Sequence, residues 1–182
     1  MNSENPIGAD DQQETEEPHQ RLDPWWIVGF VDGEGCFSVS IHRNEANARR
    51  TGGWQLTPVF QVSQHESNRN VLERIAAHFG CGNLYGKGPN SSVMTFTVSR
   101  LSDLADTVVP FFEEHTLRVK DRDFRTFAEI VRSMQQREHW SPEGFDRLVR
   151  SAYSMNAHGK QRSRDIEDIL QGSSGTVRQA PR

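Results

Sequence analysis

Two acidic side chains with the potential to do chemistry stand close together near the N-terminus. Asp32 and Glu34 flank Gly33 at the end of an almost wholly apolar run, residues 25–31. The preceding Asp23-Pro24 pair predicts a helix that starts there, so both acids fall at its C-terminal end, where the helix dipole disfavours anions. A divalent cation would reverse that penalty, and carboxylate and carbonyl oxygens suit Mg²⁺. The alternative is an ordinary Asp-Gly turn that closes a buried helix.

The rest of the sequence predicts an α+β domain around this helix. Strict alternation of apolar and polar residues indicates strands, and apolar residues at a spacing of three and four indicate helices. The resulting order is α-ββ-α-ββ followed by further helices. The strands are expected at Cys36–Arg43, Trp54–Gln64, Asn83–Gly88 and Val93–Ser99, and the later helices at Asn68–Phe79, Ser102–Phe112, Val119–Gln136, from Ser141-Pro142 onward, and at Ser163–Leu170.

Polar side chains gather on one face of the predicted sheet. In the strand from Cys36, the residues Phe37, Val39 and Ile41 share one face, which leaves the serines and His42 on the other. A two-stranded ribbon with such hydrogen-bonding groups fits the major groove of DNA, where every base pair presents a distinct pattern. A sheet whose polar face simply meets water is the other interpretation.

The stretch IVGFVDGEG, Ile27 to Gly35, resembles the signature of the LAGLIDADG homing endonucleases. The strands that follow, the Gly80-Cys81-Gly82 turn and the segment Leu117–Lys120 resemble that family in order and spacing. The resemblance implies an αββαββα fold with an antiparallel, saddle-shaped sheet and helices on one face. Because the signature occurs once, the chain resembles the homodimeric branch, in which each subunit supplies one acid.

The resemblance also assigns roles to individual residues. Glu34, Gln64 and Lys120 match the catalytic positions, and Glu34 with the Gly33 carbonyl would hold Mg²⁺, a site that Mn²⁺ or Ca²⁺ can also occupy. Some relatives carry a basic residue where this chain has Asn68, and the adjacent Arg69 is a candidate substitute. The signature helix predicts a dimer interface at Trp26, Gly29, Phe30 and Asp32, of which Asp32 is also expected to support the turn. The expected DNA contacts are Ser38, Ser40, His42, Asn44, Gln55, Thr57, Gln61, Tyr85, Lys87, Thr95 and Thr97, with Arg43, Arg49 and Arg50 on phosphates.

Composition fits one soluble domain with unevenly distributed charge. The 182 residues carry a formal charge of −4, but residues 1–23 hold seven acids and one base, which leaves 18 acids and 20 bases in the remainder. We therefore expect a disordered acidic tail at 1–22, an endonuclease domain at 23–171 and a disordered tail at 172–182. Two distant cysteines and the lack of a long apolar run indicate an intracellular protein, in a bacterial cytoplasm or an organelle, with no membrane partner.

These observations favour a homodimeric, Mg²⁺-dependent endonuclease that cuts both strands of a long, partly palindromic DNA site. The resemblance implies products with a 5′-phosphate and a 3′-hydroxyl. Two alternatives remain open. One is a binding module without cleavage activity, either a maturase that holds intron RNA or a DNA-binding regulator, and the other is an α+β protein with no nucleic-acid partner.

Overall fold

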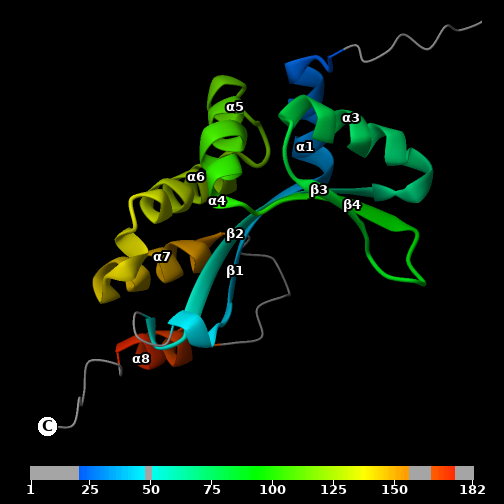
Figure 1. Ribbon diagram of the computed structural model, residues 1–182. Coiled ribbons are helices and arrows are strands. Elements are labelled where there is room, and N and C mark those ends of the chain that lie inside the picture. Colours follow the sequence, from blue (N-terminus) through cyan, green and yellow to red (C-terminus); the bar gives the residue numbers. More distant parts are fainter. Residues whose placement is uncertain (1–20, 48–50, 156–164, 175–182) are drawn as a thin grey trace, which may run out of the picture.

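The computed structural model describes residues 21–47, 51–155 and 165–174. Its helices pack against a four-stranded antiparallel sheet (Figure 1), which confirms the predicted α+β fold. In these ranges, no helix has both the length and the hydrophobicity that crossing a lipid bilayer requires.

The signature helix α1 (Pro24–Glu34) begins as its sequence predicts. The Asp23 carboxylate accepts hydrogen bonds from the backbone nitrogens of Trp25 at 2.8 Å and Trp26 at 3.1 Å, and proline occupies the first turn. Strand β1 follows α1 directly, because Gly35 is both the cap of the helix and the first residue of the strand. A Cβ atom at Gly35 would lie 2.5 Å from the Val31 side chain, so this sharp junction requires glycine. The inward side of α1 is formed by Ile27, Val28 and Val31.

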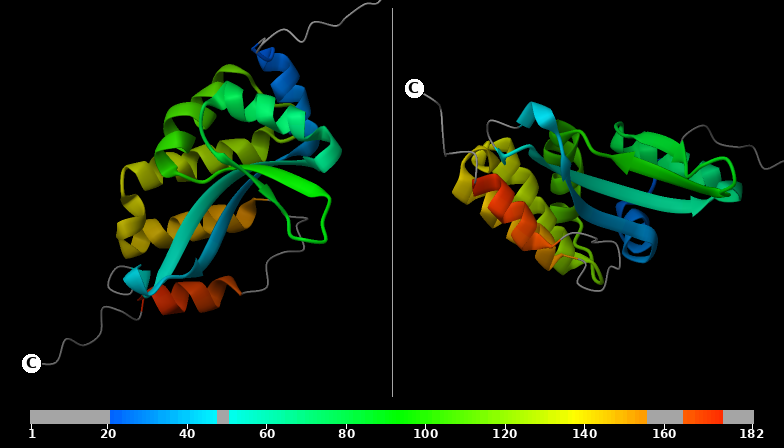
Figure 2. Two further views of the ribbon diagram at one scale, coloured as in Figure 1. Left: turned by 45° about the vertical axis from the view of Figure 1, so that its right-hand side comes forward. Right: turned by 90° about the horizontal axis from the view of Figure 1, so that it is seen from below.

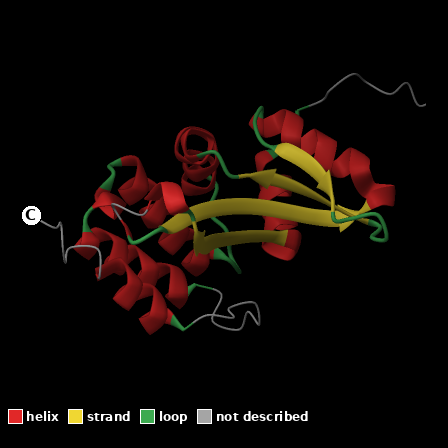
Figure 3. Cartoon of the chain, turned by 60° about the horizontal axis from the view of Figure 1, so that its bottom comes forward, coloured by secondary structure: helices red, strands yellow, loops and turns green. Residues whose placement is uncertain are grey.

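The sheet has the strand order β1-β2-β4-β3, and all its neighbours are antiparallel. Its strands are β1 (Gly35–Arg43), β2 (Trp54–His65), β3 (Asn83–Gly86) and β4 (Val93–Val98). Alternate residues of β1, β2 and β4 are buried, as the polar-apolar pattern predicts. Figure 3 shows the strands running across the molecule as one curved sheet.

Helices cover the apolar face of this sheet. Helix α3 (Arg69–Phe79) contacts β2 and β4 and ends at Gly80, whose φ of 64° is the left-handed conformation that glycine adopts most easily. Helix α6 (Asp121–Gln135) contacts β1 and β2, and α7 (Pro142–Ser154) contacts β1. The predicted helix at Ser102–Phe112 is a continuous helical segment with a π-helical middle, made of α4 (Leu101–Asp103), η3 (Leu104–Val108) and α5 (Val109–Glu114).

Phenylalanine rings fill the space between the sheet and the helices. The β1–β2 register pairs Phe37 with Phe60, and their rings stack at a centroid distance of 5.1 Å. Phe37 also meets Phe112 edge-on at 5.5 Å and Phe127 at 5.3 Å. All four rings are buried, and through them α6 packs against the sheet, as the ribbon views in Figure 2 show for the backbone.

The ends of several elements differ from the sequence-based expectation. Helix α6 begins at Asp121 rather than Val119: its first helical hydrogen bond runs from the Phe124 nitrogen to the Lys120 oxygen, and the nitrogens of Val119 and Lys120 bind the Asp32 carboxylate. The last described helix is α8 (Ile166–Ser174), so the expected boundary at residue 171 falls inside a helix. Leu22 is buried, although it belongs to the segment expected as a tail. The expected disorder of residues 1–20 and 175–182 lies outside the described residues.

Candidate active site

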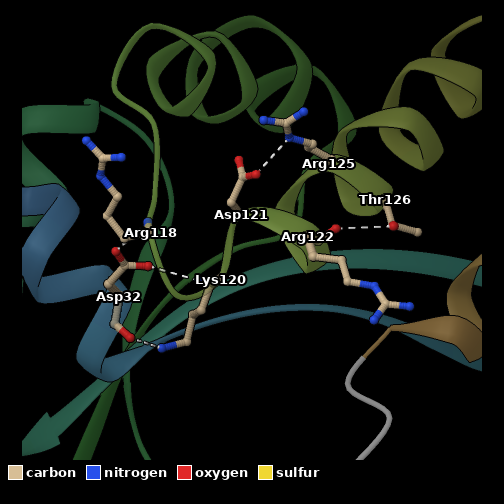
Figure 4. A network of polar contacts seen from close by, with 7 residues as sticks. All are labelled: Asp32, Arg118, Lys120, Asp121, Arg122, Arg125 and Thr126. Carbon is tan, nitrogen blue, oxygen red and sulfur yellow. Dashed lines mark hydrogen bonds and ion pairs between the residues drawn. The ribbon is translucent and has the colours of Figure 1, made fainter.

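The C-terminal end of α1 and the segment before α6 are joined by the Asp32 carboxylate. Its Oδ2 accepts a hydrogen bond from the Arg118 nitrogen at 2.7 Å, and its Oδ1 accepts from the nitrogens of Val119 and Lys120, each at 3.1 Å (Figure 4). The dipole of α1 disfavours a negative charge at its C-terminal end. The three successive N–H groups just before α6 stabilise the negative Asp32 carboxylate and so offset that cost. Asp32 therefore connects two segments 86–88 residues apart rather than closing its own turn.

Lys120 makes the return contact. Its Nζ donates to the backbone oxygen of Asp32 and, at 3.2 Å, to that of Gly33. Carbonyl oxygens at a helix C-terminus lack helical partners and attract cations. The acid of α1 thus binds the segment before α6, and the base of that segment binds the end of α1, which places the Lys120 ammonium beside the turn that carries Glu34.

Glu34 is exposed, and among the described residues its carboxylate has no hydrogen-bond or ion-pair partner. It is the last residue of α1, next to the exposed Gly33. One exposed carboxylate beside C-terminal helix carbonyls fits a Mg²⁺ ion, which retains waters and binds substrate phosphate in addition to one or two protein carboxylates. The donor set proposed from the sequence is therefore chemically suitable, although the Gly33 oxygen already accepts from Lys120.

Gln64 is the second-last residue of β2, an inner strand of the sheet. The antiparallel register begins with Gly35 paired with Val62, so Gln64 lies on β2 two residues beyond the pair at the α1–β1 junction. Asn68 Nδ2 donates to Gln64 Oε1 at 3.2 Å, which fixes the amide orientation. Within the described residues, no hydrogen bond joins Gln64 to Glu34 or to Lys120.

Asn68, and not Arg69, contacts the predicted catalytic glutamine. The Arg69 guanidinium binds Glu73 at 2.6 Å one turn further along α3, and both side chains are exposed. Arg69 is thus paired away from Gln64, and its expected substitution for the missing basic residue has no support in this geometry.

The sheet register brings most of the expected DNA-contacting residues onto one face. Cross-strand neighbours pair Ser40 with Thr57 and His42 with Gln55, while two side-chain hydrogen bonds link Gln61 to Thr97 at 3.4 Å and Ser63 to Thr95 at 2.9 Å. The Thr57 hydroxyl oxygen is buried, whereas its neighbour Ser40 is exposed. Ser38, Tyr85 and Lys87 complete this group, which we call the polar sheet face: Ser38, Ser40, His42, Gln55, Thr57, Gln61, Ser63, Tyr85, Lys87, Thr95 and Thr97.

The hairpin between β1 and β2 uses two of the expected DNA contacts internally. The Arg43 guanidinium lies 4.0 Å from the centre of the Trp54 ring, and its Nη1 donates to the Gly52 oxygen at 2.6 Å. The Asn44 amide donates to Gln55 Oε1 and accepts from the Ala46 nitrogen. These contacts shape the loop. Arg49 and Arg50, expected on phosphates, lie outside the described residues.

An apolar stripe of α1 remains exposed. Trp26 keeps 43% of its surface accessible and stacks on Phe30 at a centroid distance of 5.0 Å. Gly29 is exposed, and a Cβ placed there would meet no atom within 4 Å. With Gly33, these residues have the spacing i, i+3, i+4, i+7 of a single helix face. By contrast, Asp32, predicted at the same interface, directs its carboxylate to its own chain.

Two further features concern the surroundings of Lys120. Arg118 and Arg122 are exposed and form no ion pair with another described residue, so they flank Lys120 with available positive charge. The Cys36 thiol is the second. Burial raises its pKa above the ordinary value, and the charge of Lys120 opposes that rise. The positive charge of Lys120 therefore lies close enough to β1 to stabilise a thiolate at Cys36.

Comparisons with known proteins agree with this arrangement. Residues 27–131 match the family described as LAGLIDADG endonuclease. The homing endonuclease I-ApeII of Aeropyrum pernix is 32% identical over 149 residues, which cover 80% of this chain and 86% of that protein. The structure of the archaeal intron-encoded homing endonuclease I-Vdi141I complexed with DNA is 30% identical, with a TM-score of 0.76 and coverage of 85% and 96%.

A second similar structure is I-SmaMI bound to an uncleaved DNA target in the presence of calcium ions. It is 27% identical with a TM-score of 0.73, and the match covers 82% of this chain but 49% of that longer one. The sequence match, the relatives and the strand order around α1 together establish that this chain belongs to the LAGLIDADG endonuclease family.

Proposed function

We propose that this endonuclease acts as a homodimer that cuts both strands of a long, partly palindromic DNA site by divalent-metal-dependent phosphodiester hydrolysis. The main support for the proposal is that the exposed carboxylate of Glu34 and the fixed ammonium of Lys120 lie close together at the end of α1. Glu34 has no partner within the described residues, while the Lys120 ammonium is held one residue away, on the Gly33 oxygen.

Glu34 is the proposed metal ligand, with the Gly33 carbonyl as a second donor. When bound, Mg²⁺ would supply positive charge that stabilises the negative charge developing on the phosphoryl oxygens. Mn²⁺ and Ca²⁺ accept the same oxygen donors, and calcium is named with the similar I-SmaMI complex. Since one chain offers one such acid at this turn, two chains meeting along α1 would bring two acids together.

Lys120 and Gln64 are the proposed partners of the scissile phosphate. The ammonium of Lys120 would bind a phosphoryl oxygen and neutralise charge there. Gln64 stays neutral at every pH, so its amide can orient the attacking water without taking a proton. The Asn68 hydrogen bond to Oε1 leaves the Gln64 Nε2 hydrogens and a second Oε1 lone pair for this role.

The polar sheet face is the proposed reader of base edges. Its hydroxyls, amides and imidazole can donate and accept hydrogen bonds in the major groove. Arg118 and Arg122 would bind phosphates and set the register of the duplex without specifying sequence. The similar I-Vdi141I and I-SmaMI structures contain DNA, which supports this proposal.

The homodimer is proposed from the exposed stripe of α1. An apolar helix face that includes Trp26, Phe30 and two glycines is costly to leave in water, and glycine permits close approach of a second helix. Contact between two copies of this stripe would be isologous, so the DNA half-sites would be related by the same two-fold axis.

A cleavage selection tests the proposed function. Purified protein is incubated with a randomised duplex library and Mg²⁺, and cut ends are captured and sequenced, with EDTA as the metal-free control. We expect Mg²⁺-dependent double-strand cuts at sites with partial two-fold symmetry. Tight, salt-sensitive binding of DNA or RNA without any cut would support a binding module instead. No nucleic-acid binding at low salt would refute both.

A further inference from the structure

We propose that Asp32 is a positioning residue for phosphodiester cleavage, acting through Lys120. The inference rests on the proposed catalytic role of Lys120 and deepens it. In this account, the Asp32 carboxylate holds the segment 118–120 against the end of α1, and without it the Lys120 ammonium loses its fixed place beside Glu34.

Both ends of Lys120 are tied to the same residue. Its backbone nitrogen donates to Asp32 Oδ1 at 3.1 Å, and its Nζ donates to the Asp32 backbone oxygen. A lysine side chain has four rotatable bonds and loses substantial entropy when its ammonium is held in one place. Holding the Lys120 backbone through Asp32 fixes the point from which the side chain extends, so the end of α1 stays within reach of its ammonium.

The neighbouring basic residues show that this restraint is specific to Lys120. Figure 4 shows Arg122 extending away from Asp32, and Arg125 is paired with Asp121 at 2.9 Å. The Arg118 nitrogen contacts Asp32 at 2.7 Å, but its guanidinium points elsewhere. Of the bases in this segment, Lys120 is therefore the one whose charged group is brought to the α1 turn.

Asp23 provides a matched comparison at the other end of the same helix. Its carboxylate also accepts backbone hydrogen bonds, but from Trp25 and Trp26, two and three residues away. Removing either carboxylate leaves backbone N–H groups without their acceptor and costs capping energy. Only the loss of Asp32 releases a segment that carries a proposed catalytic side chain.

Amine labelling measures how accessible the Lys120 ammonium group is, and it needs neither DNA nor metal. The full chain is treated with a limiting amount of an acylating reagent, and labelling of Lys120 is compared by mass spectrometry with that of the exposed Lys87. We expect the Lys120/Lys87 ratio to rise several-fold in Asp32→Ala, to rise less in Asp32→Asn, which keeps one acceptor oxygen, and to stay unchanged in Asp23→Ala. An unchanged ratio in folded Asp32→Ala would overturn the proposal.

Cleavage kinetics then test whether the effect on catalysis passes through Lys120. On a duplex selected with the wild type, Lys120→Met and Asp32→Ala are each expected to lower kcat by about 100-fold or more, with little change in KM. The double variant should be no slower than Lys120→Met, because Asp32 has no lysine left to position. Asp23→Ala should keep the wild-type kcat.

The outcomes separate this inference from the proposed function. If the wild type cuts no duplex in the library, the proposed function fails, and labelling still decides whether Asp32 positions Lys120. If the wild type cuts, but Asp32→Ala keeps its kcat or the two substitutions lower kcat multiplicatively, then Asp32 does not act through Lys120 and the inference is wrong.

Discussion

Replacing Gly29 with alanine should have opposite effects on the folded subunit and on the dimer. Gly29 lies inside α1, is exposed, and has no atom within 4 Å of the place where a Cβ would stand. Alanine favours a helix interior over glycine by about 1 kcal/mol. In a chain of this size, that gain raises the melting temperature by roughly 2–4 °C. The isolated subunit should therefore become more stable.

The same methyl group should weaken association. If two α1 helices approach at Gly29, each subunit adds one methyl to a contact built for glycine, and overpacking costs about 1–3 kcal/mol. Because about 1.4 kcal/mol is a tenfold change in affinity, the dimer Kd should rise between about 5-fold and 140-fold. Sedimentation across a concentration series measures the dimer Kd, and thermal unfolding of dilute protein measures the melting temperature of the subunit.

Ala77→Gly is the matched control, because residue 77 is exposed in the last turn of α3, away from the stripe. It should lower subunit stability by up to about 1 kcal/mol and leave the dimer Kd unchanged. A Gly29→Ala protein whose dimer Kd is equal to or below that of the wild type would refute the proposed helix contact, whatever happens to the melting temperature.

Three further changes test the surroundings of the site. Asn68→Ala should slow cleavage, because the Gln64 amide loses its fixed orientation, whereas Arg69→Ala should keep the wild-type rate; equal effects in single-turnover assays would contradict the assignment. Alkylation of Cys36 should reach its maximal rate at a higher pH than that of free cysteine, because burial raises the thiol pKa, and Lys120→Met should move this profile further upward; a downward move would contradict the proximity of the ammonium. Gly82→Ala should lower stability by more than about 1 kcal/mol in denaturant titrations, because φ is 83° and a Cβ would lie 2.7 Å from the Phe96 ring; an unchanged midpoint would refute that packing.

Local sequence patterns are sufficient for the helices and strands and for the polar face of the sheet. The Asp23-Pro24 start of α1, the alternation in β1 and β2, and the Gly80 end of α3 are each determined within a few residues, and the structure confirms them. The same alternation placed the polar residues on one sheet face. The site residues were assigned by resemblance, since the tetrapeptide Asp32–Gly35 is equally suited to an ordinary turn.

Contacts between segments that are far apart in the chain cannot be predicted from local sequence patterns. The partners of Asp32 are 86–88 residues away, and no local pattern indicates that its carboxylate would bind backbone nitrogens ahead of α6. The position of Arg43 on Trp54 likewise depends on how the hairpin closes. The pairing of β2 with β4, which sets the order β1-β2-β4-β3, depends on packing across the whole core.

The most direct test of the central claim is single-turnover cleavage by Glu34→Gln with Mg²⁺, with Glu129→Gln as the control. Glu129 is an exposed glutamate of α6, so its substitution matches the change in charge. If Glu34 holds the metal, Glu34→Gln should bind the selected duplex at least as tightly as the wild type but cut it at least about 100-fold more slowly, since the lost charge stabilisation amounts to about 3 kcal/mol or more. Glu129→Gln should cut normally. Cleavage by Glu34→Gln at the wild-type rate would contradict the account.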